Sequence, residues 1–293
     1  MSSVPTYRFA PTPNGALHIG HAYSALMNVR FAAAAEGRLL LRIEDLDPTR
    51  CKREFETAIV DDLVWLGVAF ADPPRRQSEH AEDYASALDA LRARGLVYPC
   101  FCTRSMVVEA NAGRDPDGAP RYGGACRNLA ARGVDARLAA GERAVWRLDS
   151  AAARLAVPDE LVWREWGEGD RETSQNADPS LWGDFVLRGR DSAASYHLAV
   201  VVDDALQGVT DVVRGRDLFA ATAAHRLLQA LLALPAPRYR HHRLALDAGG
   251  AKMTKSAGAT PLRKLRAEGL SAQALKIALG FAVGKTRLKV ELS

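Results

Sequence analysis

In the first hundred residues, short apolar runs typical of strands alternate with longer segments in which apolar positions recur with helical periodicity. An apolar run at 7–10 breaks at a turn rich in Pro, Asn and Gly and continues directly into a helical pattern over 18–36. A second apolar run at 38–43 is typical of a buried parallel strand, and amphipathic helices are expected at 50–66 and 78–94. This β-α-β-α order predicts an α/β fold with crossover helices and a parallel sheet.

The segment from 98 to 179 has a different character. Its periodicity is weak, Gly, Pro and Arg are frequent, and the Asp-Pro-Asp-Gly sequence at 115–118 is a strong turn signal. This pattern predicts an insertion in the α/β unit. Regular patterning resumes at 181–188, and the run at 196–204 is the most strand-like stretch of the whole chain.

Further elements are predicted in the C-terminal third. We expect a strand at 209–213, a helix at 219–234 that ends before a proline-rich turn, a short strand at 243–246 and a last helix near 272–279. A glycine-rich loop that carries lysines separates the last strand from the last helix.

The composition is that of an ordinary globular protein. With 293 residues, 48% of them hydrophobic and 25% charged, the chain is long enough for two compact units or for one unit with a sizeable insertion. No apolar run is long enough to span a bilayer and the N-terminus shows no leader pattern, so we expect a cytoplasmic protein without a membrane partner. The net charge of +4 permits a nucleic-acid partner without arguing for one.

The turn at 11–17 joins a strand to a helix whose first turn carries His18 and His21. Backbone N–H groups and the positive end of the helix dipole then point at whatever lies above the sheet. The two histidines share one face of the helix, and Gly20 lets a flat ring or a ribose approach the backbone. The arrangement suits a nucleotide whose phosphates are held in place. The alternative is a proline-rich turn followed by two surface histidines.

Two further segments carry candidate chemistry. Glu44 follows the strand at 38–43, at the carboxyl end where open α/β sheets bind ligands, although a solvated acidic turn explains it equally well. Lys252 and Lys255 lie in the loop 247–256, where compact positive charge can reach a polyphosphate. Alone, such a loop is more often simply solvated, but its combination with the histidine pair favours a nucleotide site.

These two elements resemble the signatures of the class I aminoacyl-tRNA synthetases, a His-Ile-Gly-His element and a Lys-Met-Ser-Lys-Ser loop. The chain departs from the second signature only at Thr254, which replaces one hydroxyl residue by another. The resemblance implies an α/β, Rossmann-like catalytic domain with a parallel sheet, an inserted zinc-containing subdomain and a short C-terminal helical segment. We expect a first catalytic half at 1–97, an acceptor-binding and zinc subdomain at 98–179, a second catalytic half at 180–240, and the lysine loop with the helical segment at 241–293.

The segments 8–15, 41–47 and 196–204 resemble the glutamyl/glutaminyl branch of that class, and the likeness covers nearly the whole chain. A free glutamate has two carboxylates and one ammonium, so its pocket needs cationic side chains that bind carboxylates in a bidentate way and at least one acidic side chain. A structural ion pair is the alternative role for each arginine concerned. The resemblance implies that the amino-acid pocket is lined by Arg8, Phe9, Ala10, Pro11, Thr12, Glu44, Tyr196 and Arg214.

Only about forty residues follow the lysine loop, too few for the C-terminal anticodon-binding domain that full-length glutamyl-tRNA synthetases carry. The shortened architecture resembles the glutamyl-queuosine tRNA(Asp) synthetases, which consist of the catalytic part alone. That resemblance implies a ligase that uses ATP to activate L-glutamate to glutamyl-adenylate without tRNA. It then transfers glutamate to the queuosine base in the anticodon loop of tRNA(Asp). Queuosine carries a cis-diol that is chemically similar to the terminal ribose diol that ordinary synthetases esterify.

Neither chemical step of such a reaction needs a protein nucleophile, because the enzyme positions the reactants and stabilises charge on the phosphates. We expect His18 and His21 to donate hydrogen bonds to the phosphates of ATP beside Gly20. Lys252 and Lys255 complete the predicted catalytic set, with Lys255 also binding ATP and balancing charge on the leaving pyrophosphate. Mg²⁺ is expected with the nucleotide. No DNA partner is expected, and a monomer is the expected oligomeric state.

Cys100, Cys102 and Cys126 cluster among four cysteines, and a chain without an export signal favours metal or thiol chemistry over disulfides. Three thiolates suit a tetrahedral zinc ion, and their spacing leaves Asp, Glu or water open as the fourth ligand. The resemblance to the queuosine family implies one structural Zn²⁺ with Tyr122, four residues before the last cysteine, as that ligand. The alternative is three reduced thiols in a loop-rich subdomain.

Three other functions stay open. A truncated glutamyl-tRNA synthetase would charge the usual 3′ end, and a requirement for tRNA during activation would indicate it. A nucleotidyltransferase of the same fold would share the His-Ile-Gly-His element, whereas a non-catalytic RNA-binding paralogue would not need the intact histidines and lysines.

The chain departs from the family pattern at Asn14, where Ser or Thr is usual, and at 223–226, where a Thr-Pro-Arg-Gln-like segment is common.

Overall fold

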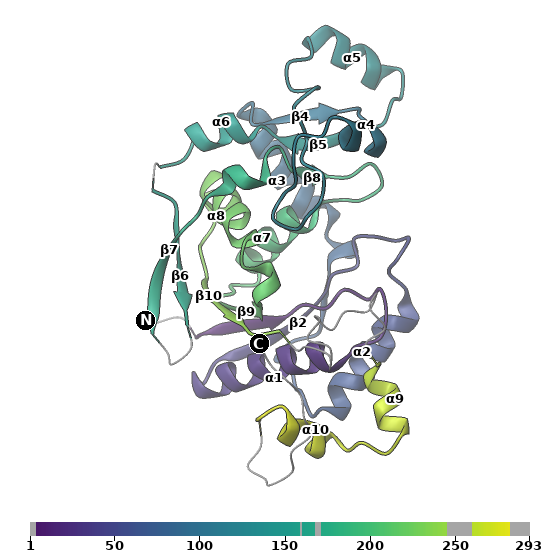
Figure 1. Cartoon of the computed structure of the whole chain (residues 1–293), viewed down its shortest axis with the longest axis vertical. Helices are drawn as coiled ribbons and strands as arrows, with labels where there is room; N and C mark the ends of the chain where they lie inside the picture. Colours follow the sequence, from purple (N-terminus) through teal and green to yellow (C-terminus); the bar gives the residue numbers. More distant parts are fainter. Residues whose placement is uncertain (1–3, 159, 168–170, 245–259, 282–293) are drawn as a thin grey trace.

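The computed structural model describes residues 4–158, 160–167, 171–244 and 260–281, and its strands form three sheets with helices packed around them (Figure 1). The lysine loop 247–256 lies outside the described residues. None of the helices within these ranges is long and apolar enough to cross a membrane.

The N-terminal sheet and its helices are built by β1 (Thr6–Phe9), α1 (Ile19–Ala34), β2 (Arg38–Ile43), α2 (Arg53–Trp65) and β3 (Arg75–Arg76). The three strands are parallel and lie in the order β1-β2-β3. Almost every residue of β1 and β2 is buried, as expected for parallel strands covered on both faces. Together with α3 (Ala81–Ala93), these elements confirm the helices and strands predicted for the first hundred residues.

The second sheet consists of β6 (Val162–Trp166), β7 (Glu172–Asn176), β9 (Asp211–Gly215) and β10 (Arg238–His242). Its order is β7-β6-β10-β9, in which β6, β10 and β9 are parallel and β7 is antiparallel. β1 lies beside β9, where the Thr210 N–H donates to the carbonyl oxygen of Thr6 at 3.0 Å. The carboxyl ends of strands from both sheets therefore meet at one edge, where open α/β sheets bind ligands.

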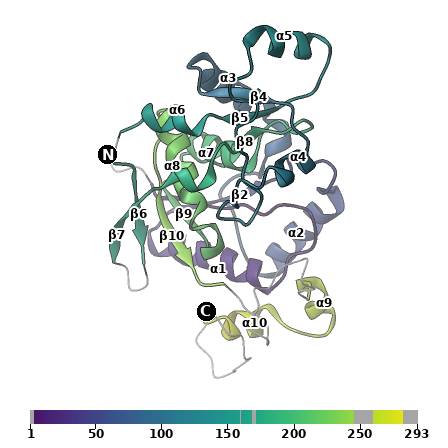
Figure 2. The same ribbon diagram turned by 45° about the horizontal axis from the view of Figure 1, so that its top comes forward.

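The third sheet is antiparallel and lies at the opposite end of the molecule from α1 (Figure 1, Figure 2). β6 and β7 fall within 98–179 and join the sheet of β9 and β10, whereas the strand at 186–188 pairs with the third sheet. The predicted domain boundaries stay a prediction. The third sheet and its surroundings comprise β4 (Val97–Cys100), α4 (Arg104–Glu109), α5 (Ala131–Ala139), β5 (Val145–Leu148), α6 (Ser150–Leu155) and β8 (Val186–Arg188).

The remaining helices are α7 (Tyr196–Leu206), α8 (Ala221–Leu231), α9 (Leu262–Ala267) and α10 (Ala272–Ala278), with single turns at η1 (Gln77–Glu79), η2 (Pro179–Trp182) and η3 (Arg216–Leu218). One apolar core lies between the third sheet and α3, α7 and α8, and a second lies under the N-terminal sheet. α9 and α10 contribute to the second core and pack near α1 and α2.

The predicted strand at 196–204 is wrong, because this run forms helix α7. The apolar residues at 198–202 are all buried, since α7 packs against α3 and α8 as well as the strands. A helix buried on every side has no polar face, so its sequence shows no helical period. The available signal was Ser195, whose hydroxyl accepts from the Leu198 N–H as an N-cap. Of the predicted strand at 243–246, residues 243 and 244 follow the end of β10 (Arg238–His242) and belong to no strand, and residues 245 and 246 lie outside the described residues.

Candidate active site

A cavity of about 550 Å³ opens where β1, β2, β9 and β10 end and where α1 begins. Its wall contains all the predicted glutamate-pocket residues together with the predicted nucleotide residues that the structure describes. Lys252 and Lys255 lie outside the described residues, so their place at this cavity stays a prediction. The predicted residues found in the wall are Arg8, Phe9, Ala10, Pro11, Thr12, His18, Gly20, His21, Glu44, Tyr196 and Arg214.

His18 and His21 cap the first turn of α1 reciprocally. The Gly20 N–H donates to Nδ1 of His18 at 3.1 Å, and the His18 N–H donates to Nδ1 of His21 at 3.2 Å. Because Nδ1 accepts in each ring, the proton of each neutral imidazole resides on Nε2. The ring centroids lie 3.9 Å apart. The two rings therefore present adjacent N–H donors at a helix N-terminus, an arrangement that suits phosphate oxygens.

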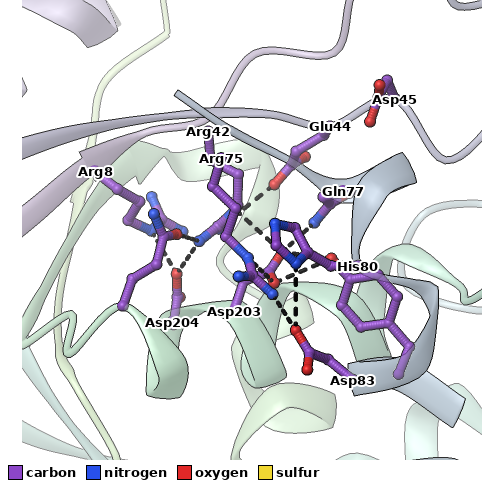
Figure 3. A network of polar contacts seen from close by, with 12 residues as sticks. Arg8, Arg42, Glu44, Asp45, Arg75, Gln77, His80, Asp83, Asp203 and Asp204 are labelled. Carbon is purple, nitrogen blue, oxygen red and sulfur yellow. Dashed lines mark hydrogen bonds and ion pairs between the residues drawn. The ribbon is translucent and has the colours of Figure 1, made fainter. Parts of the chain in front are cut away.

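A buried ionic network lies behind the cavity wall and connects β1, β2 and α7 (Figure 3). One oxygen of Asp204 accepts from Nε of Arg8 at 3.1 Å and from Nη1 of Arg42 at 2.7 Å. Arg42 is fully buried, and it also lies 3.5 Å from a carboxylate oxygen of Glu44 and 3.7 Å from one of Asp203. Burial raises the pKa of Asp204, but Arg8 and Arg42 outweigh burial and hold that pKa below its usual value.

Asp203 extends the network away from the cavity. It accepts hydrogen bonds from Nε of Arg75 at 2.8 Å, from the side-chain amide of Gln77 at 2.8 Å and from the hydroxyl of Tyr84 at 3.0 Å. Arg75 also pairs with Asp83 at 2.5 Å (Figure 3). Each buried carboxylate thus has the donors that burial requires, and the network fixes α7 to β3 and α3.

Glu44 is the acid that this network presents to the cavity. Its backbone N–H donates to the carbonyl oxygen of Pro11 at 3.1 Å, which holds it beside the loop that follows β1. Burial raises the pKa of Glu44, while Arg42 and Arg8 act in the opposite direction. A ligand ammonium in the cavity would favour the ionised form and give Glu44 a second cationic partner besides Arg42.

Arg214 and Tyr196 face the cavity from β9 and from the first turn of α7. Nη1 of Arg214 lies 3.5 Å from the hydroxyl oxygen of Tyr196. Burial raises the pKa of Tyr196 to about 12, although Arg214 lowers it, so the hydroxyl remains protonated and can donate. A guanidinium beside a phenolic hydroxyl suits a carboxylate.

Sequence reasoning missed residues that hold these side chains in place. Arg42 and Asp204 lie in segments that carried the family resemblance but had no assigned role, although an acid in a run expected to be buried signals a cationic partner. Thr222, His225 and His241 contact Arg214, and no sequence signal places them there. The wall also contains Asn14, Ser24, Val213, Gly215, Asp217, Leu218, His242 and Leu244.

A second candidate site lies at the end of β4, where Cys100, Cys102 and Cys126 converge. Their sulfur atoms all lie within 4.8 Å of one another. The hydroxyl oxygen of Tyr122 lies 3.6 Å from Sγ of Cys102 and accepts from the Cys126 N–H at 2.6 Å. Three soft sulfur donors and one phenolic oxygen at a common point fit a tetrahedral zinc ion.

Two arginines surround this cysteine cluster. The guanidinium of Arg147 lies 4.1 Å from the ring centroid of Tyr122, and Arg190 donates to the carbonyl oxygen of Cys102 at 2.9 Å. These contacts fix the Tyr122 ring and the backbone of Cys102 beside the three sulfur atoms.

The family model described as "tRNA synthetases class I (E and Q), catalytic domain" matches residues 4–281. A glutamyl-Q tRNA(Asp) synthetase of Rhodobacter capsulatus is 43% identical over 282 residues, which cover 94% of this chain and 99% of that protein. A glutamate–tRNA ligase of Aquifex aeolicus is 36% identical over 276 residues, covering 94% of this chain and 56% of that protein.

The fold is also similar to that of a solved structure. The crystal structure of a glutamate tRNA ligase from Elizabethkingia meningosepticum, in complex with its amino acid, superposes with a TM-score of 0.71 at 27% identity. The match covers 87% of this chain and 53% of the other, so the chain spans about half the length of that ligase.

Proposed function

The chain belongs to the class I aminoacyl-tRNA synthetases of the glutamyl/glutaminyl branch, and we propose that it activates L-glutamate with ATP and transfers it to the queuosine base of tRNA(Asp). The single observation that carries the proposal is the cavity in which two arginines, one glutamate and a histidine pair share one wall. This combination has a counter-charge for each charged group of glutamate and N–H donors for the phosphates of ATP.

The glutamate subsite combines Arg8, Glu44, Tyr196 and Arg214. Glu44 binds the ammonium group, and Arg214 with Tyr196 binds the side-chain carboxylate. Asp204 accepts a hydrogen bond from Nε of Arg8, so the terminal nitrogens of the Arg8 guanidinium donate to a substrate oxygen. Phe9, Ala10, Pro11 and Thr12 form the adjoining wall.

The nucleotide subsite begins at the N-terminus of α1. The Nε2–H groups of His18 and His21 bind phosphate oxygens, and Gly20 admits the nucleotide to the backbone. An oxygen of the glutamate α-carboxylate attacks the α-phosphorus, and the bond to the leaving pyrophosphate breaks. Lys252 and Lys255, which lie outside the described residues, supply positive charge to the pyrophosphate. Mg²⁺ supplies further charge compensation to the phosphates when bound.

In the second step a hydroxyl of the acceptor attacks the carbonyl carbon of the adenylate, and AMP leaves with the electron pair of the broken C–O bond. The cis-diol of queuosine offers such a hydroxyl. The choice of queuosine is supported by the name of the Rhodobacter capsulatus relative, whose length this chain covers almost completely. A zinc ion held by Cys100, Cys102, Tyr122 and Cys126 would serve as a structural crosslink near β4.

Pyrophosphate exchange into ATP, screened over the amino acids with and without tRNA, tests the first step. We expect exchange with glutamate alone. Exchange that requires tRNA would favour the alternative, a truncated glutamyl-tRNA synthetase that charges the 3′ end. Absence of exchange with every amino acid would contradict both functions.

Transfer is tested with tRNA(Asp) that carries or lacks queuosine. Each tRNA is also prepared without its 3′-terminal adenosine, which removes the usual acceptor diol. Glutamate bound to the shortened tRNA only when queuosine is present is the expected result. If removal of the terminal adenosine abolishes transfer, the acceptor is instead the ribose at the 3′ end.

A further inference from the structure

All five N–H donors of Arg214 have an acceptor in the structure. Nε donates to Nε2 of His241 at 3.1 Å, and Nη1 donates to Nδ1 of His225 at 3.2 Å. The other Nη1 proton points to the Tyr196 hydroxyl at the longer distance of 3.5 Å. Nη2 donates to the carbonyl oxygen of Leu218 at 3.1 Å and to the hydroxyl of Thr222 at 2.8 Å.

None of these partners carries a negative charge. Arg214 is only 5% exposed, and no carboxylate within the described ranges forms an ion pair with it. The other buried arginines differ, since Arg8 and Arg42 share Asp204. A buried guanidinium with neutral partners alone leaves a positive charge uncompensated, so the cavity is prepared for an anion at this point.

We propose that His225 and His241 are positioning residues for glutamate recognition, because their unprotonated ring nitrogens hold the Arg214 guanidinium in place without neutralising it. The inference rests on the proposed function, in which Arg214 binds the side-chain carboxylate. Carboxylate partners in these two places would orient the guanidinium equally well but would cancel the charge that attracts the substrate.

The tautomer of each ring follows from its second hydrogen bond. His241 accepts through Nε2, so its proton resides on Nδ1 and is donated to Glu165 at 2.9 Å. His225 accepts through Nδ1, so its proton resides on Nε2 and is donated to Nδ1 of His197 at 3.2 Å. These second partners keep the acceptor nitrogens turned toward Arg214.

Both rings remain neutral near pH 7. Burial lowers the pKa of His241 to about 4; Arg214 acts in the same direction, whereas Glu165 opposes it. Burial and Arg214 also lower the pKa of His225 well below its usual value. A protonated ring would lose its acceptor and face the guanidinium with a like charge. The weakest contact of Arg214, to Tyr196, is then the one that a substrate carboxylate displaces most easily.

The test compares His225→Gln with His225→Leu in glutamate-dependent pyrophosphate exchange. A glutamine amide retains one acceptor and one donor, whereas leucine has neither. We expect His225→Leu to raise KM for glutamate by about tenfold to a hundredfold, with KM for ATP unchanged. His225→Gln should stay within a few-fold of the wild type. His80→Asn is the control, because His80 lies outside the cavity wall.

A double-variant cycle separates positioning from damage to the fold. If His225 acts through Arg214, His225→Leu should have little further effect on KM for glutamate in a protein whose Arg214 guanidinium has already been removed by Arg214→Lys. Additive losses in the double variant, or equal losses in His225→Gln and His225→Leu, would overturn the positioning role. A wild-type enzyme without glutamate-dependent exchange would instead overturn the proposed function, so the two failures are distinguishable.

Discussion

Arg8 and Asp204 are 196 residues apart in the chain and are joined by a hydrogen bond of 3.1 Å between Nε and Oδ1. Their side chains are only 5% and 6% exposed. The bond uses the Nε edge of the guanidinium, and Arg8 also forms part of the cavity wall. The hydrogen bond therefore orients the Arg8 guanidinium toward a ligand in the cavity. It also connects α7 to β1 behind the site.

Replacing Asp204 by asparagine removes the negative charge between two buried arginines and keeps nearly the same side-chain volume. We expect the free energy of unfolding to fall by about 3–5 kcal/mol, because Arg8 and Arg42 would stay buried without this carboxylate. Equilibrium unfolding in urea at neutral pH measures the loss.

Asp72 provides a matched control. Asp72 also forms an Asp–Arg ion pair, with Arg38, but the side chains of Asp72 and Arg38 are 51% and 45% exposed. Asp72→Asn should change the free energy of unfolding by less than about 1 kcal/mol, because solvent screens such a pair. Similar losses in both variants would contradict the role assigned to burial.

Mild acid should destabilise the protein through its buried histidines. Burial lowers the pKa of both His197 and His241 to about 4, and Arg214 acts in the same direction. The unfolded chain takes up these protons near pH 6.5 and the folded chain only near pH 4, so the free energy of unfolding falls as pH drops through this interval. Each imidazole contributes at most about 3 kcal/mol to the fall.

Asp62 opposes this trend, because burial raises its pKa to about 6 and its protonation favours the folded state below that pH. Unfolding midpoints measured from neutral pH down to about pH 5 report the sum of these effects. Asp62→Asn removes the opposing group and should lose more stability over the same range than the wild type. A wild-type midpoint that rises on acidification would contradict the prediction.

His18 has two roles that one substitution can separate. Asparagine caps helices well through its side-chain oxygen, but it lacks the Nε2–H donor of the imidazole. His18→Asn should therefore change the free energy of unfolding by less than about 1 kcal/mol. It should slow glutamate-dependent pyrophosphate exchange by about 10²–10³-fold, because a preorganised donor to the phosphates is lost. Urea unfolding and exchange rates measure the two effects.

His80→Asn is the corresponding control. His80 lies outside the cavity wall and 3.6 Å from a carboxylate oxygen of Asp83, so its replacement should leave the exchange rate unchanged. Full exchange activity in His18→Asn would show that the phosphate-binding role of His18 is wrong, whatever happens to stability.

The fold of the first hundred residues was predictable because apolar spacing and turn residues there indicate the same elements. The helix at 196–206 was not, because an apolar helix packed on several sides loses the polar face on which a periodicity argument depends. The convergence of three cysteines at short spacing was predictable, and it is found in the structure. Tyr122 came from the family resemblance, and the structure places its hydroxyl beside them.

The cavity-lining residues were predictable because short motifs place them at strand ends and at a helix N-terminus. Their supporting contacts were not, because these join positions far apart in the chain. Asp204 meets Arg8 only once α7 has packed behind β1, and His241 meets Arg214 only through the pairing of β9 with β10. A single sequence contains the residue types for such contacts but not the distances between them.

The cysteine cluster should bind zinc without taking part in catalysis. Cys126→Ala should lower the zinc content of protein purified without chelators from about one ion per chain to none, because a structural site needs its thiolates. Glutamate-dependent exchange should persist in molecules that remain folded, since the cluster lies outside the cavity wall. Elemental analysis and exchange assays on the same samples measure both effects.

Tyr122→Phe then tests the fourth ligand without removing a cysteine. If the phenolic oxygen coordinates zinc, its loss should weaken zinc binding in competition with a chelator, whereas Cys51→Ser should not, because Cys51 lies apart from the cluster. Unchanged zinc affinity in Tyr122→Phe would leave three sulfur ligands and an exchangeable fourth position. In that case the hydrogen bond from the Cys126 N–H to Tyr122 would be the whole role of the hydroxyl.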